Sequence, residues 1–295
     1  MSMIHCQNPE QLRAQVSEWR NRNETVAFVP TMGNLHAGHL SLVDIAREKA
    51  AHVVVSIYVN PLQFSPDEDF SSYPRTLDDD LKKLDAATVD LVFTPETTTI
   101  YPDGEEQSTF VEVPGLSQII EGEFRPGFFK GVATVVLKLF NMVQPDYAIF
   151  GEKDFQQLLV IRRMVSDLKL PIEIIGAAIK RETDGLAMSS RNNYLNLLER
   201  GKSRLLSETL LSLRHQIEQG HGIEKAQRNA VEILQNHGFV VDYVTLRETT
   251  GLDNVSNDDI LSNRELVILA AARMGKTRLI DNIKFVIERQ NDNKT

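Results

Sequence analysis

The chain has 295 residues, of which 42% are hydrophobic and 25% are charged, and its formal net charge is −9. This length corresponds to one large or two ordinary domains, and the composition is typical of a globular protein with a buried core. A chain this acidic has no broad electrostatic surface for nucleic acid or an anionic membrane, so a phosphate ligand needs a local cluster of donors.

The expected elements of the first 180 residues alternate between strand and helix. Residues 52–59 (HVVVSIYV) form a nearly continuous β-branched run, as in a strand buried on both faces. Alternating strands and helices predict right-handed βαβ units and a parallel sheet. The expected strands are 25–29, 52–59, 90–94, 147–150 and 172–179, and the expected helices begin at Asn8-Pro9 or cover 38–51, 77–84, 132–143 and 155–168.

The pattern changes near Lys180, where we expect a domain boundary. Two polar-faced helices precede three strand-like segments, and the polar segment 248–264 between two of these strands is expected to be a surface loop. The tail after Ile287 is expected to be disordered. The expected helices here are 203–219 and 223–237, and the expected strands are 239–247, 266–272 and 278–287.

Cysteine content and the N-terminal sequence predict a cytoplasmic location. Cys6 is the single cysteine, which excludes an intrachain disulfide. The first residues, MSMIHCQNPEQLR, lack the basic and apolar regions of a signal peptide. No apolar run approaches the roughly 20 residues that a membrane-spanning helix needs.

The segment from Pro30 to His39 lies between an expected strand and an expected helix. A helix N-terminus offers N–H groups and a positive dipole end to a phosphate, and glycine at 33 and 38 lets the backbone approach a ligand. His36 and His39 are one helical turn apart and can donate to phosphate oxygens. The alternatives are incidental histidines or an HxxH metal site.

Asn60 and Gln63 follow the buried strand of residues 52–59. Amide side chains at the end of a strand can bind hydroxyl and carboxylate groups of a small substrate. The alternative is turn chemistry, because Asn-Pro commonly ends a strand.

Three consecutive aspartates, Asp78, Asp79 and Asp80, begin the helix that follows Pro74-Arg75-Thr76. Acidic residues in a first turn stabilise the helix dipole, which is one interpretation. The other is Mg²⁺ ligation together with phosphate oxygens.

Two further segments contain groups that suit nucleotide chemistry. Lys153 follows an expected strand and opens a helix, where its charge can neutralise a reacting phosphate, and Gln157 lies one turn later. The run Met188-Ser-Ser-Arg191 offers hydroxyls and a guanidinium to polyphosphate oxygens. The alternatives are a solvated charge cluster for the first and an ordinary linker loop for the second.

Gly275-Lys276-Thr277 imitates the end of a P-loop, but the motif also needs glycine at position 270. That position is Ala270, and the preceding stretch is strand-like. We therefore expect no P-loop here.

In this order and spacing, the segments PTMGNLHAGH, VSIYVNPLQF, SYPRTLDDD, GEKDFQQ, DGLAMSSRN and LIDN resemble the signature set of the pantothenate synthetase family over nearly the whole chain. The resemblance implies a Rossmann-like domain of the nucleotidyltransferase type at 1–180, with the histidine pair as a HIGH-like element. It implies that 181–295 is a smaller α+β lid domain of helices and a small antiparallel sheet, with the Ser/Arg segment as a KMSKS-like loop. It also implies a homodimer.

The implied reaction joins (R)-pantoate to β-alanine with ATP and Mg²⁺, through a pantoyl-adenylate, giving pantothenate, AMP and pyrophosphate. The family's proton donor corresponds to His39, for which we expect phosphate hydrogen bonding instead. By resemblance, Gln63, Gln157 and Asn60 bind pantoate or β-alanine, and Asp79 and Asp80 serve the metal. The implied ATP site is Met32, Gly33, Asn34, Leu35, His36, Ala37, Gly38, His39, Gly151, Glu152, Lys153, Asp154, Lys180, Met188, Ser189, Ser190 and Arg191, of which His36, His39 and Lys153 are the catalytic residues.

One position departs from the family pattern, and two other functions compete with the ligase. Phe128 stands where the family usually has histidine after Arg-Pro-Gly, and phenylalanine cannot donate a hydrogen bond. One rival function is a simple nucleotidyltransferase, which would want more cations for a phosphorylated acceptor. The other is a catalytically silent nucleotide-binding module, which would tolerate loss of Lys153 or of a histidine.

Overall fold

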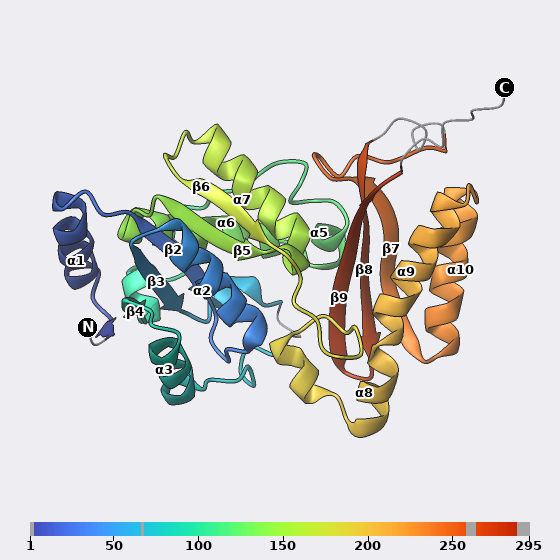
Figure 1. Cartoon of the computed structure of the whole chain (residues 1–295), viewed down its shortest axis with the longest axis horizontal. Helices are drawn as coiled ribbons and strands as arrows, with labels where there is room; N and C mark the ends of the chain where they lie inside the picture. The colour runs from blue at the N-terminus through green and yellow to red at the C-terminus, as the bar shows by residue number, and fades with distance from the viewer. Residues whose placement is uncertain (1–2, 66–67, 258–263, 288–295) are drawn as a thin grey trace. The chain divides into compact units, whose positions relative to one another are not determined.

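The structure is a computed structural model that describes residues 3–65, 68–257 and 264–287. The chain divides into two compact units, Met1–Lys180 and Arg181–Thr295 (Figure 1). The tail expected after Ile287 and part of the loop expected at 248–264 lie outside the described residues. No helix among the described segments has both the length and the apolar character to cross a membrane.

The first unit contains a six-stranded parallel sheet in the order β1-β4-β3-β2-β5-β6. The predicted parallel sheet is therefore confirmed. The sequence patterns missed the three-residue strand β1, which pairs with β4 and is too short to show periodicity. The strands are β1 (Ile4–Cys6), β2 (Val26–Thr31), β3 (His52–Ile57), β4 (Leu91–Phe93), β5 (Tyr147–Gly151) and β6 (Glu173–Ala177).

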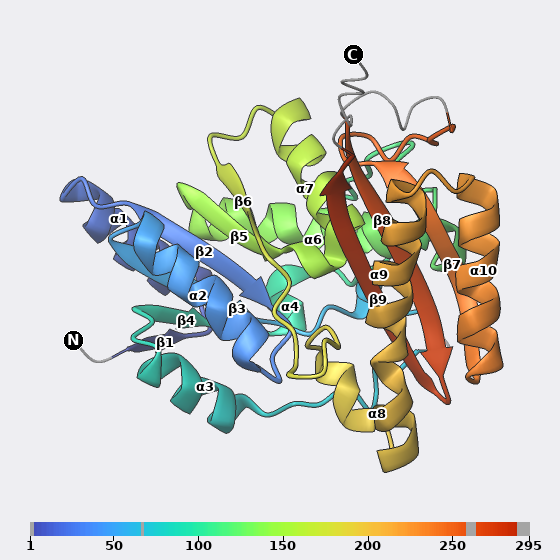
Figure 2. The same cartoon turned by 45° about the vertical axis from the view of Figure 1, so that its right-hand side comes forward.

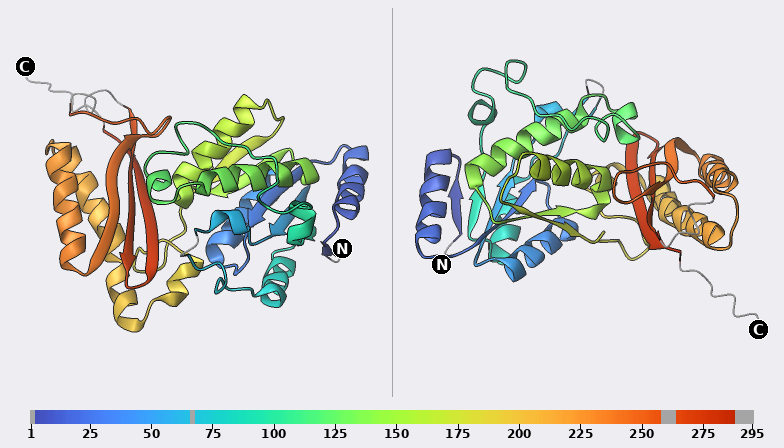
Figure 3. Two further views of the ribbon diagram at one scale, coloured as in Figure 1. Left: turned by 180° about the vertical axis from the view of Figure 1, so that it is seen from behind. Right: turned by 90° about the horizontal axis from the view of Figure 1, so that it is seen from above.

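Helices cover both faces of this sheet (Figure 3), as a βαβ connection requires. Phe28 and Val54 belong to the core beneath α1, α6 and α7, whereas the adjacent residues Ala27 and Val53 pack with α2 and α3. This alternation explains why the strands are apolar throughout. The helices are α1 (Pro9–Asn21), α2 (Ala37–Lys49), α3 (Leu77–Ala86), α4 (Thr97–Ile100), α5 (Glu121–Phe124), α6 (Phe128–Val143) and α7 (Phe155–Asp167), with 3₁₀ turns η1 (Pro61–Gln63) and η2 (Glu152–Asp154).

The strand order reverses direction between β2 and β5. From β2 the chain moves outward to β3 and β4, and it returns to the other side of β2 for β5 and β6. Ligands of open parallel sheets bind at such a reversal, outside the carboxyl ends of the strands. The segments after β2, β3 and β5 all leave from this edge, because the three strands are parallel and adjacent.

Local sequence explains where two helices begin. Asn8 caps α1 by accepting from the amides of Glu10 and Gln11 at 2.7 and 3.2 Å, as Asn-Pro predicted. Helix α6 begins at Phe128, four residues before the predicted start, directly after Gly127 with φ of 83°. Only glycine adopts this backbone conformation readily, so Gly127 ends the preceding turn and allows the helix to begin at the next residue.

The second unit packs two helices on one face of an antiparallel sheet in the order β7-β8-β9 (Figure 2). Gly275, with φ of 58°, lies in the tight turn between β8 and β9, so the expected absence of a P-loop is confirmed. The elements are η3 (Ser190–Tyr194), α8 (Leu197–Ser203), α9 (Leu205–Glu218), α10 (Ile223–Asn236), β7 (Phe239–Glu248), β8 (Glu265–Met274) and β9 (Thr277–Val286).

Candidate active site

The loop between β2 and α2 is held by a buried carboxylate from α3. Asp80 has no exposed surface. Its two oxygens accept from the backbone amides of Asn34 and Leu35 at 2.8 and 2.7 Å and from the Thr76 hydroxyl at 3.1 Å. These contacts fix the shape of the histidine loop, and the supporting role of Asp80 at a metal stays a prediction.

Asp79, the other predicted metal residue, faces solvent. Its side chain is 66% exposed and forms an ion pair with Lys82 at 3.3 Å. Among the described residues, no three histidine, cysteine or acidic side chains are grouped as metal ligands. Mg²⁺ that binds with ATP usually takes one or two carboxylates and completes its ligands with phosphate oxygens and water, so Mg²⁺ and the metal role of Asp79 stay predictions.

At Gly33 the backbone of the same loop lies close to the side chains of Ile57 and Asp80. Gly33 has φ of 82°, and a side chain there would meet the Ile57 methyl at 3.1 Å and an Asp80 oxygen at 3.2 Å. On the other side of the loop, the Lys83 ammonium donates to the Leu35 carbonyl at 2.8 Å. The sequence interpretation missed Lys83, although its position three residues after Asp80 places both side chains on one helical face.

The two histidines cap the N-terminus of α2 with one ring nitrogen each. His36 Nδ1 accepts from the Gly38 amide at 3.1 Å, and His39 Nδ1 accepts from the His36 amide at 3.3 Å. The ring centroids are 4.1 Å apart. Because Nδ1 is an acceptor in both rings, the proton of each neutral imidazole is on Nε2. The pair therefore presents two Nε2–H donors beside the helix N-terminus.

Both imidazoles are held in the neutral form. Burial, with the charges of Lys153 and Lys83 adding to it, lowers the pKa of His36 to about 4. Burial, then the neighbouring His36 and the same two lysines, lowers the pKa of His39 to about 3. These couplings bring Lys153, from the segment after β5, into electrostatic range of the pair. A neutral His39 suits hydrogen bonding to phosphate and not proton delivery near neutral pH.

This titration predicts a loss of stability on mild acidification. The unfolded chain protonates the two histidines near pH 6.5, whereas the folded protein keeps them neutral to about pH 4 and 3. The unfolded state binds more protons in this window, so the free energy of unfolding should fall as pH drops from 7 to 5.

The measurement is the difference in Tm between pH 7 and pH 5. His39→Asn keeps an acceptor oxygen in place of Nδ1 but cannot titrate, so it should lose less stability than the wild type. His221→Asn, at an exposed position of the second unit, should follow the wild type. Equal losses in all three proteins would contradict the assignment of the acid sensitivity to this pair.

Asn60, predicted to bind substrate, is in the interior. It has no exposed surface, its amide nitrogen donates to the Gly131 carbonyl at 3.2 Å, and its oxygen accepts from the Tyr101 hydroxyl at 2.9 Å. Both ends of the amide bond to protein, so Asn60 fixes the segment after β3 against α6. A contact of Asn60 with substrate stays a prediction.

Gln63 lies at the end of η1 with its side chain half-buried, and its backbone carbonyl accepts from Arg125 at 2.9 Å. The Arg125 guanidinium is also bidentate to Glu68, at 2.7 and 2.6 Å, and lies 3.7 Å from the Phe128 ring centroid. Phe128, the departure from the family pattern, thus stacks on the cation that holds the Gln63 backbone.

The segment after β5 carries Lys153 in η2 and Gln157 in the first turn of α7, both half-buried. Between them in the chain, Gln156 is buried, and its amide donates to the carbonyls of Leu116 and Ile119 at 2.7 and 2.8 Å. Gln156 therefore anchors this turn from within. The structure brings the histidine pair, Gln63 and the Lys153 segment to one edge of the sheet.

The remaining predicted nucleotide residues lie at and beyond the unit boundary. Lys180 is the last residue of the first unit. Met188 and Ser189 precede η3, and Ser190 and Arg191 are in its first turn, with the Ser189 hydroxyl accepting from the Arg191 amide at 3.3 Å. Met188–Arg191 therefore belong to the second unit.

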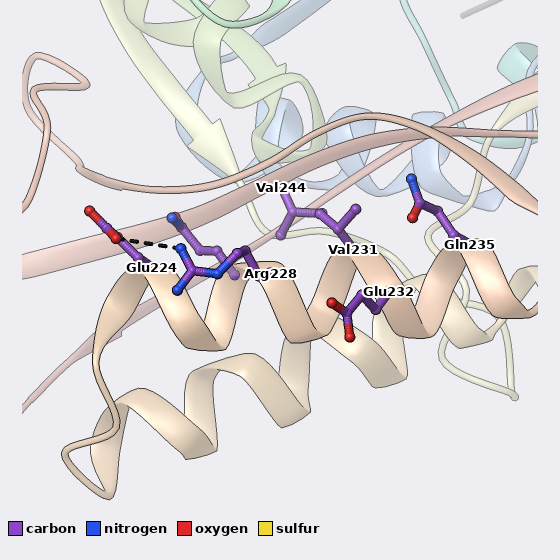
Figure 4. A pocket seen from close by; sticks show the side chains of 7 residues that line it. Glu224, Arg228, Val231, Glu232, Gln235 and Val244 are labelled. Carbon is purple, nitrogen blue, oxygen red and sulfur yellow. Dashed lines mark hydrogen bonds and ion pairs between the residues drawn. The ribbon is translucent and has the colours of Figure 1, made fainter.

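A separate groove of about 480 Å³ runs along α10 beside β7 in the second unit (Figure 4). Glu224 and Arg228 form an ion pair across one end of it at 3.5 Å. The mixture of acidic and basic side chains does not form the cluster of donors that a phosphate needs. None of the predicted site residues lines it; its lining is Glu224, Gln227, Arg228, Val231, Glu232, Gln235 and Val244.

A parallel sheet with a histidine-capped helix and a lysine at the strand-order reversal is the arrangement of a Rossmann-like nucleotide-binding enzyme. A family model described as pantoate-beta-alanine ligase matches residues 4–284. Pantothenate synthetase of Shewanella loihica is 52% identical, over 96% of this chain and 99% of that protein, and the one from Shewanella amazonensis is 53% identical over 94% and 97%.

Solved structures agree with these sequence matches. The crystal structure of pantothenate synthetase from Thermus thermophilus has a TM-score of 0.87 at 45% identity, covering 95% of this chain and 99% of that one. Pantoate-beta-alanine ligase from Francisella tularensis, complexed with beta-gamma ATP and beta-alanine, has a TM-score of 0.78 at 32% identity, covering 98% and 99%. The chain belongs to the pantoate–β-alanine ligase family, which confirms the resemblance and the enzyme class.

Proposed function

We propose that the chain condenses (R)-pantoate with β-alanine at the expense of ATP, through a pantoyl-adenylate. The observation that carries this proposal is the pair of neutral Nε2–H donors at the N-terminus of α2, within electrostatic range of Lys153. The Francisella relative, whose structure is a complex with beta-gamma ATP and beta-alanine, supports the choice of co-substrates.

In the proposed first step, a pantoate carboxylate oxygen attacks the α-phosphorus of ATP, and the bond to the bridging oxygen breaks, releasing pyrophosphate. In the second, the β-alanine amine attacks the acyl carbon, AMP leaves with its phosphate oxygen, and the amine gives up a proton. Neither step needs a protein nucleophile. The protein's contribution is to position the reactants and neutralise charge.

The roles follow from the charge and donors of each residue. Lys153 neutralises charge that develops on the α-phosphate, and His36 and His39 donate to phosphate oxygens. Met188–Arg191 bind the β- and γ-phosphates. The proposed remainder of the ATP site is Met32–Leu35, Ala37, Gly38, Gly151, Glu152, Asp154 and Lys180. Gln63 and Gln157 bind pantoate. The magnesium ion, the homodimer, the lid role of 181–295 and the cytoplasmic location stay predictions.

Replacing Gln63 by alanine should raise the KM for pantoate about tenfold or more, because a substrate group that the amide binds is left unpaired. The KM for ATP should change little. Gln118→Ala, at an exposed glutamine of the same unit, is the control. An unchanged pantoate KM would remove Gln63 from the substrate site.

The proposed reaction is tested by an assay with ATP, Mg²⁺, pantoate and β-alanine, from which each component is omitted in turn. AMP and pyrophosphate should form in step with pantothenate only when all are present. Pyrophosphate without AMP or pantothenate would identify a nucleotidyltransferase with another acceptor. No turnover with retained ATP binding would identify a silent nucleotide-binding module.

A further inference from the structure

The segment that carries Met188–Arg191 begins at an ion pair whose carboxylate is buried. Arg181 donates from two guanidinium nitrogens to the two carboxylate oxygens of Asp281, in β9, at 2.7 and 2.9 Å. The Asp281 side chain is 1% exposed and that of Arg181 is 28% exposed. One nitrogen also donates to the Asn282 carbonyl at 3.3 Å. The pair thus ties the start of the second unit to the centre of β9.

The same guanidinium closes a hairpin in its own segment. It donates to the Gly185 carbonyl at 2.9 Å and to the Ser207 hydroxyl of α9 at 3.2 Å. Arg181 and Ala187 form an antiparallel bridge, and Met188 follows directly. Arg181 therefore fixes the hairpin to both the sheet and α9, immediately before the four residues that we assign to phosphate.

The far side of these four residues is fixed to the hairpin as well. The Asn192 amide donates to the Ala187 carbonyl at 3.1 Å, and the Ser189 hydroxyl caps η3. The path of Met188–Arg191 is thus set at both ends by the hairpin, and the hairpin is set by Arg181.

We propose that Arg181 and Asp281 are positioning residues for the β- and γ-phosphates of ATP. This inference rests on the proposed role of Met188–Arg191. A bidentate Arg–carboxylate pair fixes orientation as well as distance, which a lysine cannot reproduce. Because the Asp281 carboxylate is buried, a weakened contact from residue 181 leaves it poorly paired in the interior, and we expect the hairpin to move.

Arg181→Lys is expected to weaken ATP binding, measured by calorimetry, about tenfold to a hundredfold, since small displacements of positioning groups have effects of this size. The KM for pantoate should stay within about twofold of the wild type, because a uniform loss of nucleotide binding leaves the other substrate unaffected. Amide hydrogen exchange of residues 182–192 should accelerate. Asp281→Asn, which keeps shape and removes charge, should act in the same direction.

Arg278→Lys is the matched control. Arg278 also forms an ion pair with an aspartate of the same sheet, Asp242, at 2.7 Å, with both side chains about one-tenth exposed, at 12% and 11%. This variant should lose thermal stability but keep ATP affinity and the exchange of 182–192.

The outcomes separate this inference from the proposed function. If Arg181→Lys matches Arg278→Lys in ATP affinity, or if exchange accelerates while affinity is unchanged, the positioning role is overturned. If the wild type makes no pantothenate, the proposed function fails, and ATP affinity and exchange still decide whether Arg181 positions the segment.

Discussion

Replacing Lys153 by alanine should slow formation of the adenylate by about 10²–10³-fold, since removal of one preorganised electrostatic group has an effect of this size. Lys153 lies after β5 at the strand-order reversal, and its charge reaches both histidines. ATP binding should survive, because the histidine pair and the helix N-terminus remain. Single-turnover measurement of AMP formation, together with calorimetry of ATP binding, checks both expectations.

A second readout of this variant is independent of turnover. Burial is the main cause of the low histidine pKa values and Lys153 adds to it, so Lys153→Ala should raise the pKa of His36 and His39, which NMR titration can follow. Lys49→Ala, at an exposed lysine of α2, is the control. Adenylation within tenfold of the wild type would remove Lys153 from its catalytic role.

Replacing Asp80 by alanine should lower the free energy of unfolding by about 3 kcal/mol, because two loop amides and a hydroxyl lose a buried charged acceptor. It should also weaken ATP binding, because the loop that carries His36 loses its support. Chemical denaturation and calorimetry measure the two effects.

The adjacent residue provides the control for this variant. Asp79 lies on the same helix but is largely exposed, and exposed ion pairs contribute little. Asp79→Ala should therefore leave stability and ATP binding nearly unchanged. A variant of Asp79 that needed much more Mg²⁺ for activity would contradict this expectation and support the metal role predicted for Asp79.

The sequence predicted the sheet and the edge of the sheet at which the candidate site residues gather. Alternating apolar strands and helices are a strong signal, and the histidine and lysine segments each follow a strand, so parallel topology alone gathers them. The substrates and the roles of individual residues came from the family resemblance, because motif spacing alone does not reveal them.

The protein contacts of Asn60 and Asp80 could not be predicted from the sequence, and the physical reason is the same for both. Both are polar residues beside predicted ligand segments, and sequence does not reveal whether a polar side chain faces a ligand or a backbone group. In the structure Asn60 pairs with Gly131 and Tyr101, and Asp80 pairs with the loop amides. These partners lie far away in the chain, so no local sequence pattern indicates them. The Arg181–Asp281 pair, 100 residues apart, was hidden for the same reason.

The neutral state of His36 and His39 also bears on turnover. Hydrogen bonds from an uncharged imidazole are weaker than those from an imidazolium, which would attract the phosphate chain strongly. In the proposed first step, the departing pyrophosphate carries more charge on fewer atoms than it did within ATP. A site with two extra positive charges, one on each imidazolium, would bind this product tightly. Two neutral donors can orient the triphosphate and still allow the pyrophosphate to dissociate, which favours a fast cycle.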